Sequence, residues 1–218
     1  MKESDEKKLW PTIEQINDAR KAYAVIEPRD LFYRIARELI NLIKENKTSI
    51  TLPEAIASLL QTWNRAYYRF NRFTDGHFNE IKELLIKRKD LLRTENYEHF
   101  TDKDIEDTFL EFENVLGPVG AAKCLHLLVP SFFPIWDRVI AGKYGFPLGI
   151  KGSNYIAYRC FLEHTKVQRE QLKNQFAGQD ILKAIDEYNY VTFSLPEKRK
   201  TWEKEARASA GSRGPRVK

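Results

Sequence analysis

The sequence predicts an all-α fold. Apolar residues recur at three- and four-residue steps through most of the 218 residues, which is the spacing of an amphipathic helix. Strand-like alternation is suggested only at Thr48–Leu52. Hydrophobic residues make up 42% of the chain and aromatic residues 12%, so a chain of this length can bury a core of its own. We therefore expect one helical domain over residues 12–195, preceded by a disordered N-terminus at residues 1–11.

The first three helices are predicted from their caps and apolar faces. Thr12, which follows Pro11, is a suitable N-cap for a helix over residues 12–25. One face of that helix carries Ile13, Ile16, Ala19 and Tyr23. Asp30 precedes a second helix, whose apolar positions are Leu31, Ile35, Leu39, Leu42 and Ile43. Pro53 suits the first turn of a third helix that runs to about Phe70.

The middle of the chain contains four more predicted helical segments. One covers about residues 77–92. Thr101 caps the next, which ends near Leu116. A further helix occupies about residues 120–129, and a short one follows Asp137.

The C-terminal part is predicted to be helical with a charged end. Ser153 begins a long helix that runs to about residue 175, and another covers about residues 179–191. Residues 196–218 form a charged helix, opened by Pro196, that fades into a basic, flexible tail with too few apolar residues to order itself.

The charge of the chain permits a polyanionic partner without requiring one. The net charge is +5 and the sequence pI is near 9.0, yet 31 acidic residues accompany the 36 basic ones. Between Glu95 and Glu113 there are eight acidic residues and one lysine, so this face should point away from any nucleic acid. Basic residues gather elsewhere, at Arg65, Arg69, Arg72, Lys87, Arg88, Lys89 and Arg93.

Cysteine and histidine spacing gives no sign of a metal or cofactor. Cys124 and Cys160 are far apart in apolar helical runs, so we expect reduced packing residues, and two cysteines cannot hold a four-thiolate iron–sulfur cluster. The four histidines show no zinc-ligand spacing. No apolar stretch approaches the roughly 20 residues of a membrane span. The charged N-terminus lacks the apolar core of a signal peptide. We expect an intracellular protein of the cytoplasm, nucleoid or nucleus that does not bind membranes.

The most informative segment is the run Val115–Leu128, which is followed closely by Pro130–Asp137. It predicts a helix, a tight glycine-containing hairpin, a second helix, a proline-bounded loop and an aspartate that opens another helix. Gly117 and Gly120 allow a sharp turn and a close approach to another backbone. The helix that begins near Gly120 directs unpaired N–H groups and a positive dipole end outward, which suits a phosphate.

This segment resembles the helix-hairpin-helix DNA glycosylases over residues 109–145, with the motif itself at 102–129. The resemblance implies a two-lobed helical array that binds duplex DNA as a monomer and acts as a hydrolase in base-excision DNA repair. It also implies a catalytic role for Asp137 and a flipped base held between the lobes. The residues implied to bind the DNA backbone are Gly117, Val119, Gly120, Ala121 and Lys123.

Two departures from the family pattern affect the expected chemistry. The glycines flank Pro118–Val119 rather than a single hydrophobic residue, and proline cannot adopt positive φ. Family members that also cut the DNA backbone carry a lysine where this chain has Ala122. Lys123 is one residue further on, a rotation of about 100°, so we expect it to face elsewhere. It would serve as a catalytic amine only if the turn were one residue longer. The pattern therefore implies a monofunctional glycosylase.

Each candidate residue also has a structural interpretation. Asp137 is a good N-cap, and a capping carboxylate can still face a cleft. Trp63 and Tyr67, which share a helical stripe with Phe70, would line a base pocket together with Trp136, but such stripes are more often core. We expect Tyr68 to be exposed, and His126 and the Tyr155–Phe161 and Tyr188–Tyr190 stretches to be buried.

The rival hypothesis is a non-catalytic helical adaptor that binds nucleic acid or protein through the same hairpin. The residues do not select a particular damaged base, nor DNA over RNA.

Overall fold

A computed structural model describes residues 9–63, 68, 71–89, 99–176 and 180–197. The predictions for residues 1–8, for Tyr67 and for the tail beyond residue 197 lie outside this part of the chain. Leu9 is 4% exposed and belongs to the core, so the folded domain begins before residue 12.

The described residues are helical and contain no strand, which confirms the all-α prediction. Thr48–Thr51 are irregular, and Leu52 already begins a helix. The elements in chain order are α2 (Ile13–Ile26), η2 (Pro28–Asp30), α3 (Leu31–Lys44), α4 (Leu52–Trp63), α6 (Asp75–Lys87), α7 (Asp102–Leu128), α8 (Arg138–Lys143), α9 (Tyr155–Leu172), η4 (Lys173–Gln175), α10 (Ile181–Asn189) and η5 (Tyr190–Ser194). Among these helices, none is both long and apolar enough to cross a bilayer.

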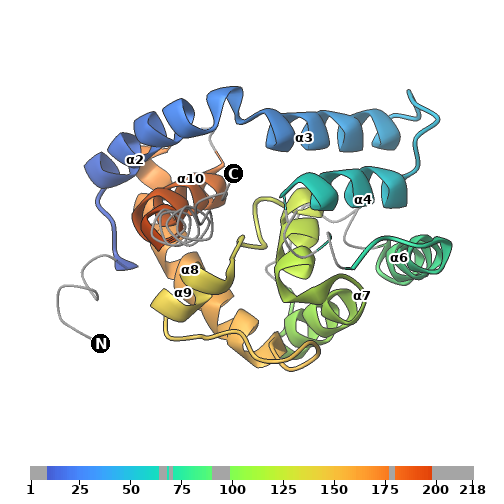
Figure 1. Ribbon diagram of the computed structural model, residues 1–218. Coiled ribbons are helices and arrows are strands. Elements are labelled where there is room, and N and C mark those ends of the chain that lie inside the picture. The colour runs from blue at the N-terminus through green and yellow to red at the C-terminus, as the bar shows by residue number, and fades with distance from the viewer. Residues whose placement is uncertain (1–8, 64–67, 69–70, 90–98, 177–179, 198–218) are drawn as a thin grey trace, which may run out of the picture.

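The helices divide between two sides of the molecule (Figure 1). Helices α2, α8 and α10 gather on one side and α4, α6 and α7 on the other, while α3 runs on from the end of α2 and lies over α4. Helix α9 packs against both α7 and α10. Helices from distant parts of the sequence also pack together, as α2 and α10 do.

Side-chain caps fix where the helices begin. The predicted N-caps Thr12 and Thr101 are confirmed, and each forms a reciprocal capping box with the residue three positions on. Thr74 caps α6 in the same way. Asp137 and Asp180 cap α8 and α10 through their carboxylates.

The predicted glycine turn lies within α7. Gly117 has φ +73° and ψ 167°, which divides α7 into a first arm (102–116) and a second arm (118–128). At the break, Tyr68 Oη donates to the Leu116 carbonyl at 2.8 Å. Tyr68 is 6% exposed, so the prediction that it is exposed was wrong. A Cβ at Gly120 would lie 2.4 Å from Tyr68 Oη, so this position has no room for a side chain.

An aromatic core fills the space between α7, α9 and the loop before α8. Phe109 of α7 stacks on Tyr158 of α9, with ring centroids 3.9 Å apart. Trp136 packs edge-on against both rings and is fully buried. A smaller apolar cluster of Ala36, Ile40, Leu59 and Leu127 joins α3, α4 and α7.

Only part of the apolar stripe that the sequence predicts on α3 is buried. Leu31 and Ile35 are 52% and 53% exposed, whereas Ala36 and Ile40 are buried. The first turn of α3 lies at the corner with α2, while the rest of the helix packs on α4 and α7. The corner therefore leaves apolar side chains uncovered.

The acidic first arm of α7 is neutralised within the fold. Glu111 accepts hydrogen bonds from Lys87 Nζ at 2.8 Å and from the Arg88 guanidinium at 2.8 and 2.9 Å. Arg159 of α9 pairs with Glu106 at 2.8 Å. Two cations that the sequence groups as available for nucleic acid, Lys87 and Arg88, are thus used internally.

A buried lysine joins α10 to the corner between α2 and α3. Lys183 is 5% exposed, and its Nζ lies 3.3 Å from both Asp30 Oδ2 and Glu187 Oε1 and 3.6 Å from Asp186 Oδ2. The same ammonium lies 4.4 Å from the centroid of the Tyr23 ring. Burial lowers the pKa of Lys183, but the three carboxylates outweigh it and the net shift is upward. The lysine therefore stays charged.

Replacing Lys183 with methionine should destabilise the fold strongly. The variant leaves the buried Glu187 and the partly buried Asp30 and Asp186 without their shared cation, and such a loss costs about 3 kcal/mol or more. The free energy of unfolding from urea titration checks this. Lys21→Met, which removes an exposed i,i+3 pair with Asp18, is the matched control and should change stability little. Equal effects of the two substitutions would contradict a structural role for the Lys183 cluster.

Candidate functional site

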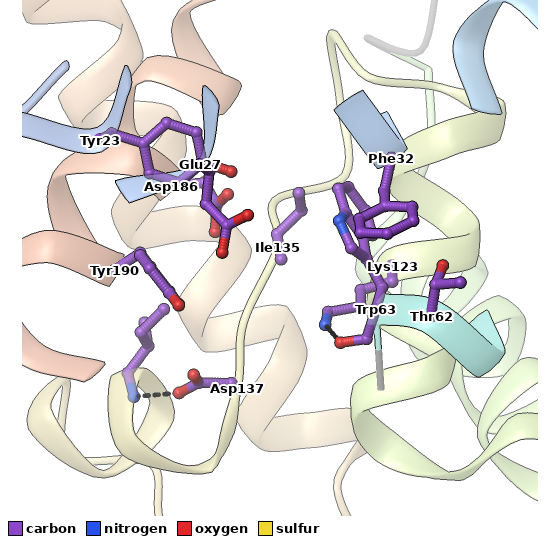
Figure 2. Close-up of a pocket in the computed structure, with 11 residues that line it drawn as sticks. Tyr23, Glu27, Phe32, Thr62, Trp63, Lys123, Ile135, Asp137, Asp186 and Tyr190 are labelled. Atoms are coloured by element: carbon purple, nitrogen blue, oxygen red, sulfur yellow. Dashed lines mark hydrogen bonds between the residues drawn. The ribbon is translucent and has the colours of Figure 1, made fainter. Parts of the chain in front are cut away.

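A cavity of about 190 Å³ opens between the two sides of the molecule (Figure 2). One wall consists of Tyr23, Asp186 and Tyr190, from α2, α10 and η5, and of Glu27, which directly follows α2. The facing wall consists of Phe32, Thr62, Trp63 and Lys123, from α3, α4 and the second arm of α7. Ile135, Asp137 and Ile140 complete the cavity.

The cavity suits one planar ring system. Its volume exceeds that of a buried cavity of about 150 Å³ that binds benzene. Aromatic side chains stand on both walls, and polar groups line the space between them. A concave, aromatic site with a few convergent polar groups is the usual form of a small-ligand pocket.

Asp137 both caps α8 and lines the cavity. Its Oδ1 accepts hydrogen bonds from the Val139 and Ile140 N–H groups, each at 2.8 Å. Its Oδ2 accepts a hydrogen bond from Ser194 Oγ at 2.8 Å. The predicted cap is confirmed, and the same carboxylate takes part in the site. Both oxygens are therefore held in place before any ligand binds.

Buried donors hold the loop that carries Asp137. His126 Nδ1 lies 2.8 Å from the Phe133 carbonyl, so Nδ1 carries the proton. Tyr158 Oη donates to the Pro134 carbonyl at 2.8 Å. His126 and Tyr158 are each fully buried, so the prediction of a buried His126 is confirmed. These contacts fix the loop just before Asp137 and thereby restrict the position of its carboxylate.

A π-helical turn contributes two residues to the site. Segment η5 follows α10 directly, and single π-turns occur often at functional sites. Within it, Tyr190 lines the cavity and Ser194 bonds Asp137. The sequence predicts Tyr190 as core, whereas it is half-buried at the cavity wall. Apolar spacing carries no signal for a π-turn, so this contribution could not be predicted.

Lys123 lies in the cavity with Asp137, so the expectation that it faces elsewhere is not met. Its Nζ donates to the Trp63 carbonyl at 2.7 Å and lies 5.3 Å from the Trp63 ring centroid. Ala122, which occupies the family's lysine position, is fully buried in the core. The kink at Gly117 thus turns Lys123 rather than Ala122 toward the site.

Acidic side chains outnumber basic ones in the cavity. Glu27, Asp137 and Asp186 face a single lysine, Lys123. Burial raises the pKa of Asp186 to about 6 against the opposing charges of Lys183 and Lys123, so it is largely ionised at neutral pH. Burial, and after it the charges of the three carboxylates, raise the pKa of Tyr190.

The structure brings together three of the residues predicted for the site, namely Trp63, Lys123 and Asp137. Trp136 lies in the core, where its Nε1 donates to the Pro118 carbonyl at 3.1 Å, and it is not among the lining residues. The predicted backbone-binding residues Gly117, Gly120 and Ala121 are buried, and Val119 is half-buried. The sequence did not predict the other eight lining residues, which are Tyr23, Glu27, Phe32, Thr62, Ile135, Ile140, Asp186 and Tyr190.

Comparison with known proteins gives no match: no family model, curated protein or solved structure matches this chain. Within the described ranges, no group of His, Cys, Asp and Glu residues is arranged to hold a metal ion.

His126 should make stability depend on pH. Burial lowers its pKa to about 4 from 6.5, against Asp180 and the Phe133 carbonyl, which raise it, while Lys183 and Arg37 also lower it. Below pH 6.5 His126 is protonated in the unfolded chain, whereas in the native state it stays neutral down to about pH 4. Stability therefore falls as pH drops toward 4, by about 3 kcal/mol at most.

The raised pKa of Asp186 acts in the opposite direction between about pH 4 and 6, so the two effects must be separated. The stability difference between wild type and His126→Asn isolates the histidine. Urea titrations at pH 7 and pH 4 measure the free energy of unfolding of both proteins. We expect the wild type to lose stability relative to His126→Asn as the pH falls. A difference that does not change with pH would show that His126 titrates normally in the native state.

Proposed function

We propose that this protein binds duplex DNA and excises a flipped base held in the cavity, as its resemblance to the helix-hairpin-helix DNA glycosylases implies. One observation carries the proposal: the aspartate of the motif lines a base-sized aromatic cavity and shares it with Lys123. Chemistry at the sugar carbon requires the base to leave the stack, and an enclosed aromatic site accepts such a base.

The arrangement of the helices supports this proposal. The cavity receives side chains from α2, α10 and η5 on one side and from α4 and α7 on the other. A site between two groups of helices agrees with the two-lobed array of that superfamily. A base would enter between the Tyr190 and Trp63 walls (Figure 2).

Asp137 would act on the sugar. Cleavage of the N-glycosidic bond leaves positive charge on the sugar carbon, and a fixed carboxylate stabilises that charge. The two N–H groups on Oδ1 and the Ser194 hydroxyl on Oδ2 keep the Asp137 carboxylate oriented without reorganisation. A water molecule then adds to the carbon, and the proton that it loses is balanced by the one that the departed base takes up, which completes the hydrolysis.

The second arm of α7 would contact the DNA backbone. It begins directly after Gly117, and Pro118 in its first turn lacks an N–H that would otherwise be unpaired. Of the residues predicted to contact the DNA backbone, Val119 and Lys123 are half-buried, whereas the others are buried. The N-terminus of a helix suits a phosphate, and Pro118 and Val119 are the half-buried part of this turn that a phosphate would reach.

Asp137→Asn should separate chemistry from capping. Asparagine caps about as well as aspartate but lacks the negative charge. We expect base release to fall by orders of magnitude, while stability changes by less than about 1 kcal/mol. Single-turnover assays on duplexes with oxidised, alkylated and deaminated bases measure release. Asp180→Asn, the same change at the N-cap of α10 outside the cavity, is the control and should retain activity.

Duplex binding by both variants should match the wild type and weaken steeply with salt, because phosphate contacts release counterions. Wild-type protein that binds duplex DNA but releases no base from any substrate would favour the adaptor hypothesis. Absence of duplex binding at low salt would overturn the proposed function and leave an adaptor that binds another partner.

Strand cleavage through Lys123 is a second candidate activity, favoured by the position of Lys123 in the cavity. The neutral amine would attack C1′ as the base leaves, and the C1′–O4′ bond would then break to give a protonated imine and a 4′-hydroxyl. Loss of a proton from C2′ to water would expel the 3′ phosphate. Borohydride should then trap a covalent adduct with the wild type but not with Lys123→Ala. Lys143→Ala on α8 is the control. Base release without an adduct would assign the cavity to hydrolysis by Asp137 alone.

A further inference from the structure

The corner between α2 and α3 carries a cluster of exposed apolar side chains. Of the eleven large apolar side chains that are exposed in the described part of the chain, five lie within residues 25–35. They are Val25, Ile26, Leu31, Phe32 and Ile35, and Val25 is 80% exposed. Single exposed apolar residues are common, whereas a cluster of this kind usually marks an interaction site.

These five apolar side chains occupy neighbouring positions. Leu31 and Ile35 are four residues apart on α3, so they are adjacent on one face of the helix, and Phe32 lies beside them. Val25 and Ile26 belong to the last turn of α2, and only a short connection separates them from α3. Helices α2 and α3 follow one another along one edge of the molecule (Figure 1). We call the five side chains the corner surface.

The corner is held in a fixed shape by a strained backbone. Arg29 and Asp30 have φ values of +66° and +45°, which non-glycine residues rarely adopt. Asp30 is fixed by a hydrogen bond from Tyr23 Oη at 2.9 Å and by the Lys183 ammonium at 3.3 Å. Strain of this kind persists only where the surrounding structure imposes it. The corner surface is therefore formed before any partner binds.

Positive groups accompany the apolar side chains of the corner. Arg29 and Arg34 are exposed, and within the described residues neither makes a hydrogen bond or an ion pair. The Asp30 carboxylate is used by Tyr23 and Lys183, so α3 begins without a side-chain cap. The free N–H groups and the positive dipole end of an uncapped helix favour a carboxylate. The corner surface thus combines an apolar area with cations and donors at defined positions.

A protein segment fits this corner better than a polyanion does. Glu27 and Glu38 flank the two arginines, and among the described residues neither makes an ion pair, so the charges of the corner nearly cancel. DNA and an anionic membrane respond to the charge summed over about 10 Å and gain little from such a balance. A protein can instead place single carboxylates opposite Arg29, Arg34 and the start of α3.

Neither end of this sequence supplies such a segment. Beyond Glu205 the chain carries basic residues and no acidic one. The first eight residues contain acids, but Met1 is their only apolar residue. A second copy would bring the same arginines together in a two-fold contact, in which one patch meets itself. The matching occupant is therefore a different protein.

We propose that the corner surface binds another protein through a segment that carries apolar side chains and carboxylates. The apolar side chains cover Leu31 and Ile35, while the carboxylates pair with Arg34 and cap α3. Burial of apolar area supplies affinity, and the placed charges fix the register of the partner. Such a partner binds whether or not the cavity excises a base.

A random peptide display library, selected on the full-length protein, provides the probe. We expect enriched sequences that combine apolar residues with Asp or Glu, and fluorescence anisotropy measures the affinity of the synthetic consensus peptide. Ile35→Ser and Arg34→Glu should each weaken binding about tenfold or more. Ile86→Ser and Arg72→Glu make the same changes at exposed positions outside the corner and should bind like the wild type. Circular dichroism melts check that all four variants are folded.

A charge-reversed peptide, with lysine in place of each acidic residue, tests the pairing directly. It should bind Arg34→Glu more tightly than it binds the wild type, because the opposite charges are restored. A selection without an acidic and apolar consensus, or a consensus peptide that binds all variants equally, would overturn the proposal.

The same variants test the other occupants. Cosedimentation with vesicles of phosphatidylserine and phosphatidylcholine, titration with duplex DNA, and sedimentation velocity of the protein alone should give equal results for wild type, Ile35→Ser and Arg34→Glu. Vesicle binding, duplex binding or self-association that both substitutions abolish and both controls keep would assign the corner to that occupant and overturn the proposal. None of these measurements uses base release, so failure of the proposed function leaves their outcome unchanged.

Discussion

The fold depends on how one buried ammonium is shared. Lys183 meets carboxylates from α10 and from the corner between α2 and α3, segments about 150 residues apart in the chain. A buried charge must be compensated, so these segments cannot separate without exposing unpaired charge. The same contacts hold the strained Asp30 and place Asp186 at the cavity. Stability of the core and shape of the site therefore have a common physical origin.

Asp137 shows how one side chain combines a structural and a chemical role. The cap uses Oδ1 and leaves Oδ2 to the Ser194 hydroxyl, so the carboxylate keeps its charge and a fixed direction. The loop before it is held at the Phe133 and Pro134 carbonyls by buried donors. Such preorganisation favours electrostatic stabilisation of a charged intermediate, because no reorganisation is needed when the charge forms.

Local sequence signals gave correct predictions where the physics is local. Thr12, Thr101 and Asp137 cap helices because a side-chain oxygen reaches N–H groups two or three residues away. Predictions failed where a distant partner decided the outcome. Tyr68 is buried because its hydroxyl donates to the Leu116 carbonyl, 48 residues later in the chain and next to the kink in α7. Lys123 faces the cavity because the kink at Gly117 sets the orientation of the second arm of α7. Counting residues from the glycines did not predict this orientation.

The sequence by itself determined the all-α class, most helix starts and the glycine turn followed by a loop and an aspartate, because periodicity, caps and positive φ are short-range properties. Only the tertiary structure decided which side chains share a cavity. Glu27, Asp186 and Tyr190 come from opposite ends of the chain, and nothing in their own neighbourhoods marks them as partners of Asp137. Their meeting depends on how α2 and α10 pack around a buried charge, and packing between distant segments leaves no periodic trace in the sequence.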